Sequence, residues 1–143
     1  MTCVLDASVA VKWFLADEPD GAEALRLVQD GETMVAPDLL LAEVCNVGWR
    51  LLRTGRMARA QFDSIPTALP HYFDELVALA ALAPRAAAIA VQLDRPVYDC
   101  FYLAVAEVRQ LPLVTADRRL LGRLATSRWR DAAIHVADYR PGG

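Results

Sequence analysis

Short apolar segments alternate with longer helical segments along the whole chain, and this alternation constrains the fold more than any other feature. Strand-like segments cover residues 2–6, 33–37, 111–117 and 133–139. Helical patterns cover about 8–17, 21–31, 38–55, 58–68, 84–94, 98–110 and 118–126, with a further short piece at 72–78. Strands separated by helices pair in parallel through right-handed crossovers, with helices on both faces. We therefore expect an α/β fold with a mainly parallel sheet. Within it, Asp38 is a candidate N-cap and Gly55 a candidate C′ residue of the long third helix.

The length and hydropathy of the chain indicate one domain over residues 1–143. It has 143 residues, of which 55% are hydrophobic, enough to bury a core. The most apolar stretch, 76–93, is interrupted by Pro84 and Arg85 and falls short of the roughly 20 apolar residues of a membrane span. The first residues include Asp6 and no basic start, unlike a secretory signal or a transit peptide. We expect a cytoplasmic protein with no membrane contact.

The cysteines indicate a reducing compartment and no zinc site. Cys3, Cys45 and Cys100 are odd in number, widely spaced and surrounded by apolar residues. We therefore expect buried, reduced thiols, and the chain has no CxxC pair that would suggest zinc.

Basic residues are concentrated in two segments of an otherwise acidic chain. The net charge is −3, which argues against a surface that attracts nucleic acid everywhere. Segments 50–59 and 118–130 nevertheless carry arginines and no acid: Arg50, Arg53, Arg56 and Arg59, then Arg118, Arg119, Arg123, Arg128 and Arg130. These arginines either bind RNA phosphates, together with Lys12, or form solvated helix faces.

Four acidic residues occupy positions where a carboxylate needs an explanation. Asp6 and Asp117 follow apolar strand-like segments, and such strand ends meet at one edge of a parallel sheet. Asp99 lies in VYDCFYLAVA, a run without Arg, Lys or His, and Glu43 interrupts an apolar helix face. A carboxylate removed from water is costly unless it is protonated, paired or bound to a cation. We expect the four acids to converge.

Each of these residues also has a structural interpretation. Asp6 and Asp117 could cap the helices that follow them, and Asp99 could interact with the start of its own helix. Glu43 could simply be exposed. Three polar neighbours could orient the acids through hydrogen bonds, or be turn-forming hydroxyls and a solvent-facing amide: Ser8, Asn46 and Thr115.

Clustered carboxylates without His or Cys suit Mg²⁺ or Mn²⁺. A divalent cation offsets their mutual repulsion, and these hard ions prefer oxygen ligands and commonly bind phosphate. Such a site can activate water for phosphodiester hydrolysis. His71 and His135 lie in a loop and a late strand, so a carboxylate or a metal-bound hydroxide is the expected base.

The chain resembles the PIN-domain family, specifically the VapC-type toxins of bacterial and archaeal toxin–antitoxin pairs. The resemblance rests on VLDASVAVKWF (4–14), APDLLLAEVCNVGWR (36–50), VYDCFYLAVAE (97–107) and LVTADRRLL (113–121). It implies a three-layer α/β/α fold and a Mg²⁺- or Mn²⁺-dependent endoribonuclease, usually a homodimer, inhibited by a small cognate VapB-type antitoxin. The family's acidic metal-binding positions match Asp6, Glu43, Asp99 and Asp117, and its flanking polar positions match Ser8, Asn46 and Thr115. Cys100 stands where small residues such as Ala are common, and we expect little consequence.

Three other functions are compatible with parts of this pattern. A receiver-type signalling domain also has an acidic pocket and a Thr, but needs a Lys on a late strand, whereas Lys12 lies in the first helix. A phosphatase with an aspartyl nucleophile needs a second Asp where this chain has Ser8. A non-catalytic PIN domain would bind RNA or a partner. Trp13, Phe14, Trp49 and Trp129 either stack bases or pack in the core or an interface, and the helices at 38–54 and 58–68 are the candidate dimer surface.

Overall fold

A computed structural model describes residues 1–15 and 18–141 and has a mixed α/β architecture. The strands are β1 (Thr2–Leu5), β2 (Thr33–Pro37), β3 (Glu75–Val77), β4 (Leu113–Thr115) and β5 (Ala133–His135). The α-helices are α1 (Ala7–Ala10), α2 (Gly21–Gln29), α3 (Leu39–Arg53), α4 (Arg59–Ala68), α5 (Leu79–Leu93), α6 (Val97–Arg109) and α7 (Arg118–Leu124). Two 3₁₀ turns are η1 (Val11–Phe14) and η2 (Leu69–Tyr72). The predicted α/β class is confirmed.

The five strands form one parallel sheet in the order β3-β2-β1-β4-β5. From β1 the chain extends the sheet on one side through β2 and β3, then crosses back to add β4 and β5 on the other side. The strand order therefore reverses at β1 and β4. In open parallel sheets, ligands bind beyond the carboxyl ends of the strands at such a reversal. Asp6 and Asp117 follow these two strands, so the topology alone places both carboxylates at the expected site.

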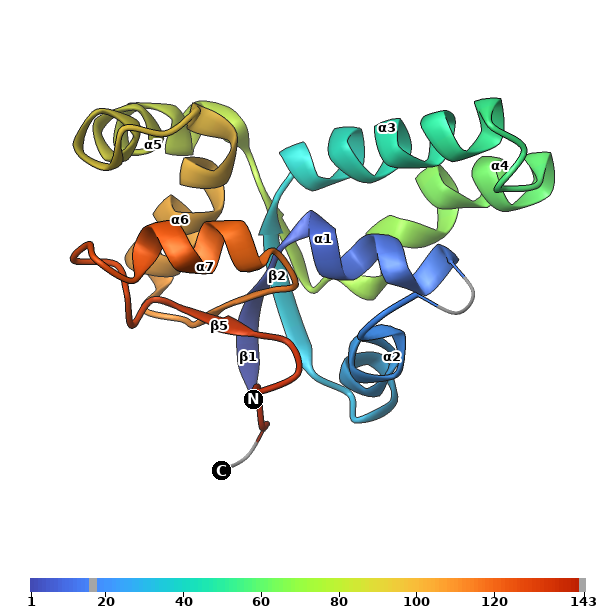
Figure 1. The fold of residues 1–143 in the computed structure, drawn as a ribbon, viewed down its shortest axis with the longest axis horizontal. Helices are drawn as coiled ribbons and strands as arrows, with labels where there is room; N and C mark the ends of the chain where they lie inside the picture. Colours follow the sequence, from blue (N-terminus) through green and yellow to red (C-terminus); the bar gives the residue numbers. More distant parts are fainter. Residues whose placement is uncertain (16–17, 142–143) are drawn as a thin grey trace.

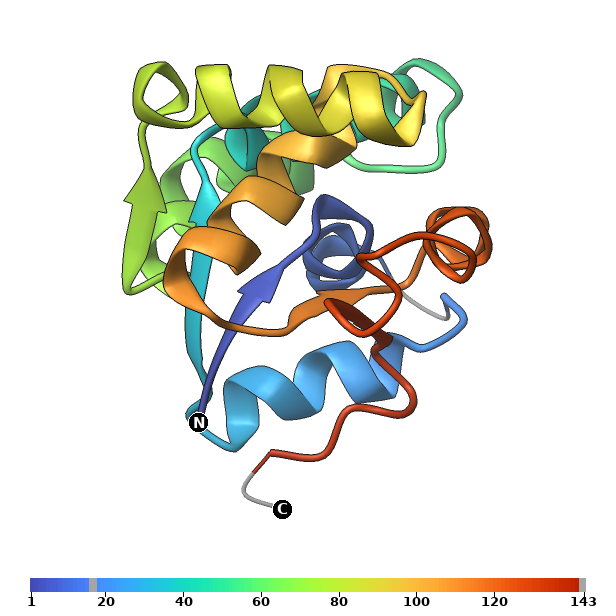
Figure 2. The ribbon, with the colours of Figure 1, turned by 90° about the vertical axis from the view of Figure 1, so that its left-hand side faces the viewer.

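Helices cover both faces of the sheet, giving three layers. Figure 1 shows α5, α6 and α7 on one side of the sheet and α1, α2, α3 and α4 on the other. Right-handed crossovers produce this division, because the connections run in opposite directions on the two sides of β1. In Figure 2, α5 crosses above α6, which packs against the sheet.

The buried side chains form one hydrophobic cluster around the sheet. Val4, Leu5, Leu113 and Val114 of the central strands have no exposed surface. These strands are covered on both faces, and their sequences are accordingly apolar without alternation. All three cysteines are free thiols, and Cys3 and Cys100 are buried as expected, whereas Cys45 is only half-buried.

The sequence interpretation of segment 72–78 is wrong. A short helical piece is expected there, but the 3₁₀ turn η2 ends at Tyr72 and the edge strand β3 follows at Glu75–Val77. This strand has three residues and pairs only with β2, so tertiary pairing rather than local pattern defines it.

One predicted helix start and one predicted helix end also need correction. The helix expected to begin at Pro84 begins at Leu79 and continues through the proline. Ala80, whose carbonyl would accept the missing N–H bond, is exposed, so water can satisfy it. The first helix ends at Ala10 and tightens into η1, while the end expected near Asp17 lies outside the described residues.

The predicted caps of α3 differ in outcome. Gly55 follows the helix with φ +75°, the left-handed conformation expected of a C′ glycine. Asp38 occupies the N-cap position but has helical dihedrals and makes no side-chain cap hydrogen bond.

Across the described ranges, no helix is both long enough and apolar enough to cross a membrane.

Candidate metal and nucleic-acid site

All four predicted acids line one pocket at the carboxyl edge of the sheet. The pocket has a volume of about 280 Å³. Its acids come from the end of β1, from α3, from the first turn of α6 and from the start of α7. Its other lining residues are Ala7, Ser8, Val11, Asn46, Val47 and Arg50. The fold therefore brings the four acids together in one pocket, as predicted.

Asp6 is the most buried of these acids, with only 6% of its surface exposed. Its Oδ2 atom accepts hydrogen bonds from the hydroxyls of Ser8 and Thr115, each at 2.7 Å. Burial raises the pKa of this carboxyl from 3.8 to about 6, and the two hydroxyl bonds oppose that rise. Asp6 lies at the N-cap position of α1 but does not cap it, because no side-chain cap bond is formed.

The two hydroxyls also tie the ends of β1 and β4 together. Ser8 Oγ accepts the backbone N–H of Ala116 at 3.0 Å, and Thr115 Oγ1 accepts that of Asp117 at 3.0 Å. Both hydroxyls therefore donate to the Asp6 carboxylate while their oxygens fix the loop that carries the next acid. This contact pattern agrees with the orienting interpretation of Ser8 and Thr115.

Glu43 is held by Tyr102, a residue that the sequence reasoning did not single out. The Tyr102 hydroxyl, on a side chain that is 1% exposed, donates to Glu43 Oε1 at 2.7 Å. Burial raises the Glu43 pKa, and the hydroxyl bond partly offsets this. Burial, together with Asp6 and Glu43, raises the Tyr102 pKa, so the phenol stays protonated. Asn46 lines the pocket as predicted.

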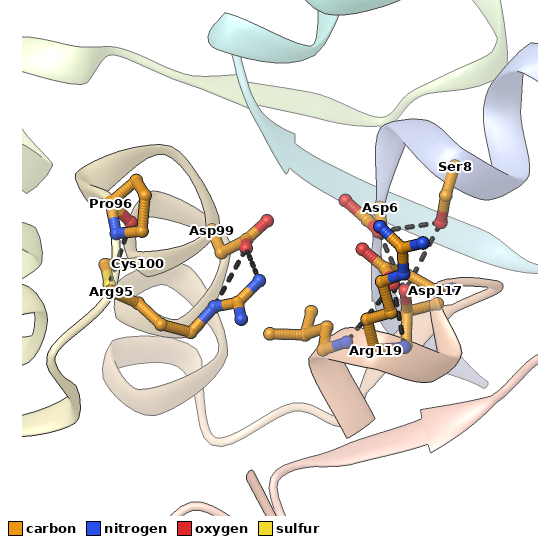
Figure 3. A network of polar contacts seen from close by, with 10 residues as sticks. Asp6, Ser8, Arg95, Pro96, Asp99, Cys100, Asp117 and Arg119 are labelled. Atoms are coloured by element: carbon orange, nitrogen blue, oxygen red, sulfur yellow. Dashed lines mark hydrogen bonds and ion pairs between the residues drawn. The ribbon is translucent and has the colours of Figure 1, made fainter. Parts of the chain in front are cut away.

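Asp99 forms an ion pair with Arg95, which was also missed. The Arg95 guanidinium donates to Asp99 Oδ2 from Nη2 at 2.7 Å and from Nε at 3.3 Å. The two residues are four apart and join the α5–α6 connection to the first turn of α6. Figure 3 shows Asp99 across from Asp6 and Asp117, with its carboxylate directed toward them. Arg95 lies just outside the apolar run, which is why the acid seemed unpaired.

Asp117 caps α7, as its structural interpretation predicted, and also faces the pocket. Its Oδ1 atom accepts the backbone N–H groups of Arg119 at 3.0 Å and Leu120 at 3.1 Å. A cap bond uses only one carboxylate oxygen, so capping and ligand binding are compatible here.

Each of the four acids uses one oxygen to accept hydrogen bonds, and its second oxygen has no hydrogen-bond donor among the described residues. Within residues 1–15 and 18–141, every hydrogen bond accepted by these carboxylates goes to Asp6 Oδ2, Glu43 Oε1, Asp99 Oδ2 or Asp117 Oδ1. One ion pair, three hydroxyl bonds and two backbone amides thus fix the orientation of the four carboxylates and leave one oxygen of each available to a ligand. Oxygens held in this way are the donors that Mg²⁺ and Mn²⁺ prefer.

The pocket is an open site rather than a closed metal cage. No three His, Cys, Asp or Glu side chains of the described ranges form a set that could hold a metal ion by themselves. Mg²⁺ is commonly bound through one or two carboxylates, with waters and substrate phosphate completing its shell. The four carboxylates, with Arg50 and Arg95, have a formal charge of −2, which one divalent ion neutralises. The donor set therefore fits a hydrated divalent cation.

Other candidate residues lie away from this pocket. Its lining includes neither His71, His135 nor Lys12. Trp13 packs against Tyr72 and donates its indole N–H to the carbonyl of Ala24 at 2.9 Å. These contacts favour a packing role for Trp13.

The remaining aromatic candidates differ in exposure. Trp129 is buried and Phe14 is half-buried, in keeping with packing roles. Trp49 is 46% exposed on α3, where the Arg53 guanidinium lies 5.2 Å from its ring centroid.

Comparisons with known proteins give one matching family model and similar proteins of two organisms. A family model described as PIN domain matches residues 3–126. Ribonuclease VapC3 of Pyrobaculum aerophilum is 30% identical over 122 residues, 84% of this chain and 92% of that protein. Ribonuclease VapC1 of Mycobacterium tuberculosis is 32% identical over 120 residues, 82% of this chain and 87% of that protein.

Two solved structures share the fold. A crystal structure of a Pyrobaculum aerophilum protein aligns with a TM-score of 0.68 and 25% identity, covering 96% of this chain and 90% of that chain. A toxin–antitoxin complex from Klebsiella pneumoniae aligns with a TM-score of 0.64 and 15% identity, covering 94% and 97%. The predicted three-layer architecture is confirmed.

Proposed function

The chain belongs to the PIN-domain family, and on this premise we propose that it is a Mg²⁺- or Mn²⁺-dependent endoribonuclease. The observation that supports this most is the pocket shared by four carboxylates, each with one hydrogen-bonded oxygen and one oxygen without a donor in the described part of the chain: Asp6, Glu43, Asp99 and Asp117. The similarity to two proteins named ribonuclease supports RNA as the substrate. The residues that flank the site are not those of a receiver domain or an aspartyl phosphatase, because Ser8 donates to Asp6 and Lys12 lies outside the pocket.

The four carboxylates would together hold a hydrated cation, through direct contacts or through its waters, and the bound cation would supply Lewis acidity toward the phosphodiester and lower the pKa of water. The chain's own contribution is orientation. Ser8 and Thr115 fix Asp6, the Tyr102 hydroxyl fixes Glu43, and two backbone amides fix Asp117. Arg50 lines the pocket and contributes positive charge toward a substrate phosphate.

We further propose that the protein is the toxin of a toxin–antitoxin pair. The relatives named VapC and the structural similarity to a chain of a toxin–antitoxin complex support a small VapB-type partner. In this proposal the protein acts as a cytoplasmic homodimer. The outer faces of α3 and α4, which include exposed Trp49, are the candidate dimer surface.

Cleavage of total RNA by the purified protein tests the nuclease proposal. We expect discrete fragments with Mg²⁺ or Mn²⁺, and loss of cleavage with EDTA or in Asp6→Ala and Asp99→Ala. Asp30→Ala, which changes an exposed acid at the end of α2, is the matched control and should cleave normally. A folded, metal-binding sample that is free of antitoxin and leaves all RNA intact would contradict general nuclease activity and favour a binding role.

A further inference from the structure

A second, basic pocket lies between the end of α5 and the segment that follows α7. Its volume is about 460 Å³, larger than that of the acidic pocket. Its polar lining comes from Gln92 at the end of α5 and from Arg123, Thr126, Ser127 and Arg128 in and after α7. No carboxylate is among its lining residues. The chemistry of this lining suits an anion.

The positive charge of the two arginines in this basic pocket is not fully neutralised by acidic side chains of the described residues. Arg123 forms no ion pair with any described residue. Arg128 contacts Glu107 at 2.9 Å, but Glu107 is already paired through both its oxygens with Arg85. One carboxylate therefore serves two guanidinium groups, which leaves a net positive charge beside the pocket.

A buried aromatic ring supports one of these arginines. The Arg128 guanidinium lies 4.7 Å from the centroid of the Trp129 ring, and Trp129 is only 6% exposed. The Trp129 indole N–H is buried and has no hydrogen-bond acceptor among the described residues. The ring thus fixes Arg128 and is too enclosed to stack on a base, so the pocket offers contacts to phosphate rather than to bases.

Helix α7 links the basic pocket to the acidic one. It is capped by Asp117 in the acidic pocket, and Arg123 follows six residues later, about 9 Å along the helix axis. Arg95, which pairs with Asp99, lies three residues after Gln92 on the facing side. Figures 1 and 2 both place α5 and α7 on the same side of the molecule.

We propose that the basic pocket binds a backbone phosphate of single-stranded RNA, beside the phosphodiester in the acidic pocket. This inference rests on the proposed nuclease function and assigns the arginines after Asp117 to substrate binding. Arg123 and Arg128 bind the strand through charge, so they contribute affinity without sequence preference. They are binding residues and not catalytic ones.

The salt dependence of RNA binding tests this assignment. The probe is a fluorescent random-sequence RNA of about 12 nucleotides, within the usual range of single-strand site sizes. Binding is measured with Mg²⁺ in an Asp6→Asn background, so that the probe stays intact, and as a function of salt. Arg123→Ala should lower the slope of log affinity against log salt by about 0.7, the effect of one lost phosphate contact. Arg26→Ala, on α2, changes an arginine that lines neither pocket; it is the matched control and should leave the slope unchanged.

Cleavage kinetics provide a second readout, without the Asp6 substitution. Arg123→Ala should raise KM and leave kcat unchanged, because it removes binding that is equal in the ground and transition states. An unchanged salt slope in Arg123→Ala, with RNA still bound by the parent, would overturn the assignment and favour an acidic protein partner for this pocket. Absence of both RNA binding and cleavage in the parent chain would instead refute the nuclease proposal itself.

Discussion

Replacement of Asp6 by Asn should stabilise the protein in the absence of metal. Burial raises the pKa of the Asp6 carboxyl from 3.8 to about 6, a difference of about 2 pH units. Each unit corresponds to about 1.4 kcal/mol, so the ionised carboxylate costs the fold about 3 kcal/mol. Asn keeps an oxygen that can accept from Ser8 and Thr115, while its amide replaces the oxygen that faces the pocket.

The sign of the pH dependence follows from the raised pKa. Well below pH 3.8 the carboxyl is protonated in both the folded and the unfolded chain, and ionisation then costs the fold nothing. The cost grows as pH rises and is complete above about pH 6, where both states are ionised. Asp6→Asn should therefore exceed the parent in free energy of unfolding by about 3 kcal/mol at pH 7.5, and by almost nothing at about pH 3.

Urea denaturation in EDTA at these two pH values measures the effect, with exposed Asp30→Asn as a control that should match the parent. Added Mg²⁺ should stabilise the parent and not the Asp6 variant, because a ligand of the folded state adds to its stability. An Asp6→Asn protein that is no more stable than the parent at pH 7.5, or a difference that does not change with pH, would refute this reasoning.

Three further substitutions have definite expected outcomes. Tyr102→Phe should lower the free energy of unfolding by about 1.5–3 kcal/mol, since it removes a buried hydrogen-bond donor to a carboxylate. Tyr98→Phe, at an exposed site of the same helix, should leave the free energy of unfolding unchanged. Equal effects of the two substitutions in urea denaturation would contradict this. Arg95→Ala should bind Mn²⁺ roughly tenfold tighter by calorimetry, because it removes a positive charge that is paired with Asp99 at the cation site; unchanged or weaker binding would argue against Arg95 opposing the cation. Gly48→Ala should lower the free energy of unfolding by about 1–3 kcal/mol, because its Cβ would lie 2.6 Å from a side-chain carbon of α4. Gly122→Ala, in α7 with open space around it, should raise the free energy of unfolding by about 0.5–1 kcal/mol. Thermal melts that rank the two variants in the opposite order would contradict this packing.

The acids at the strand ends could be predicted because two simple rules agree there. Asp6 and Asp117 each end an apolar strand-like segment, and parallel topology brings such ends to one edge. Asp99 and Glu43 could be predicted because each places a charge within an apolar helical pattern. For these four residues, local sequence and global topology give the same answer.

The residues that orient the acids were harder to identify. Tyr102 follows Asp99 by three positions and looks like one more aromatic residue in an apolar run, yet its hydroxyl crosses to Glu43 on another helix. Such a long-range partner leaves no signal in local spacing. Arg95 lies four positions before Asp99, but in the connection that precedes α6, so the pairing rule for residues of one helix does not cover it.

The errors in the fold have the same origin. Strand β3 is three residues long and depends on its pairing with β2, so its own sequence carries little information. The helix around Pro84 continues because its freed carbonyl is on an exposed residue, which a rule based on proline alone does not capture.

Mn²⁺ binding to the parent chain and to four single variants tests the central claim most directly. The variants are Asp6→Asn, Glu43→Gln, Asp99→Asn and Asp117→Asn, with Asp30→Asn as the control. We expect calorimetric titration to show weaker binding in all four variants and unchanged binding in the control. Full-affinity binding after any of the four substitutions would remove that carboxylate from the site, and binding unaffected by all four would contradict a metal centre in this pocket.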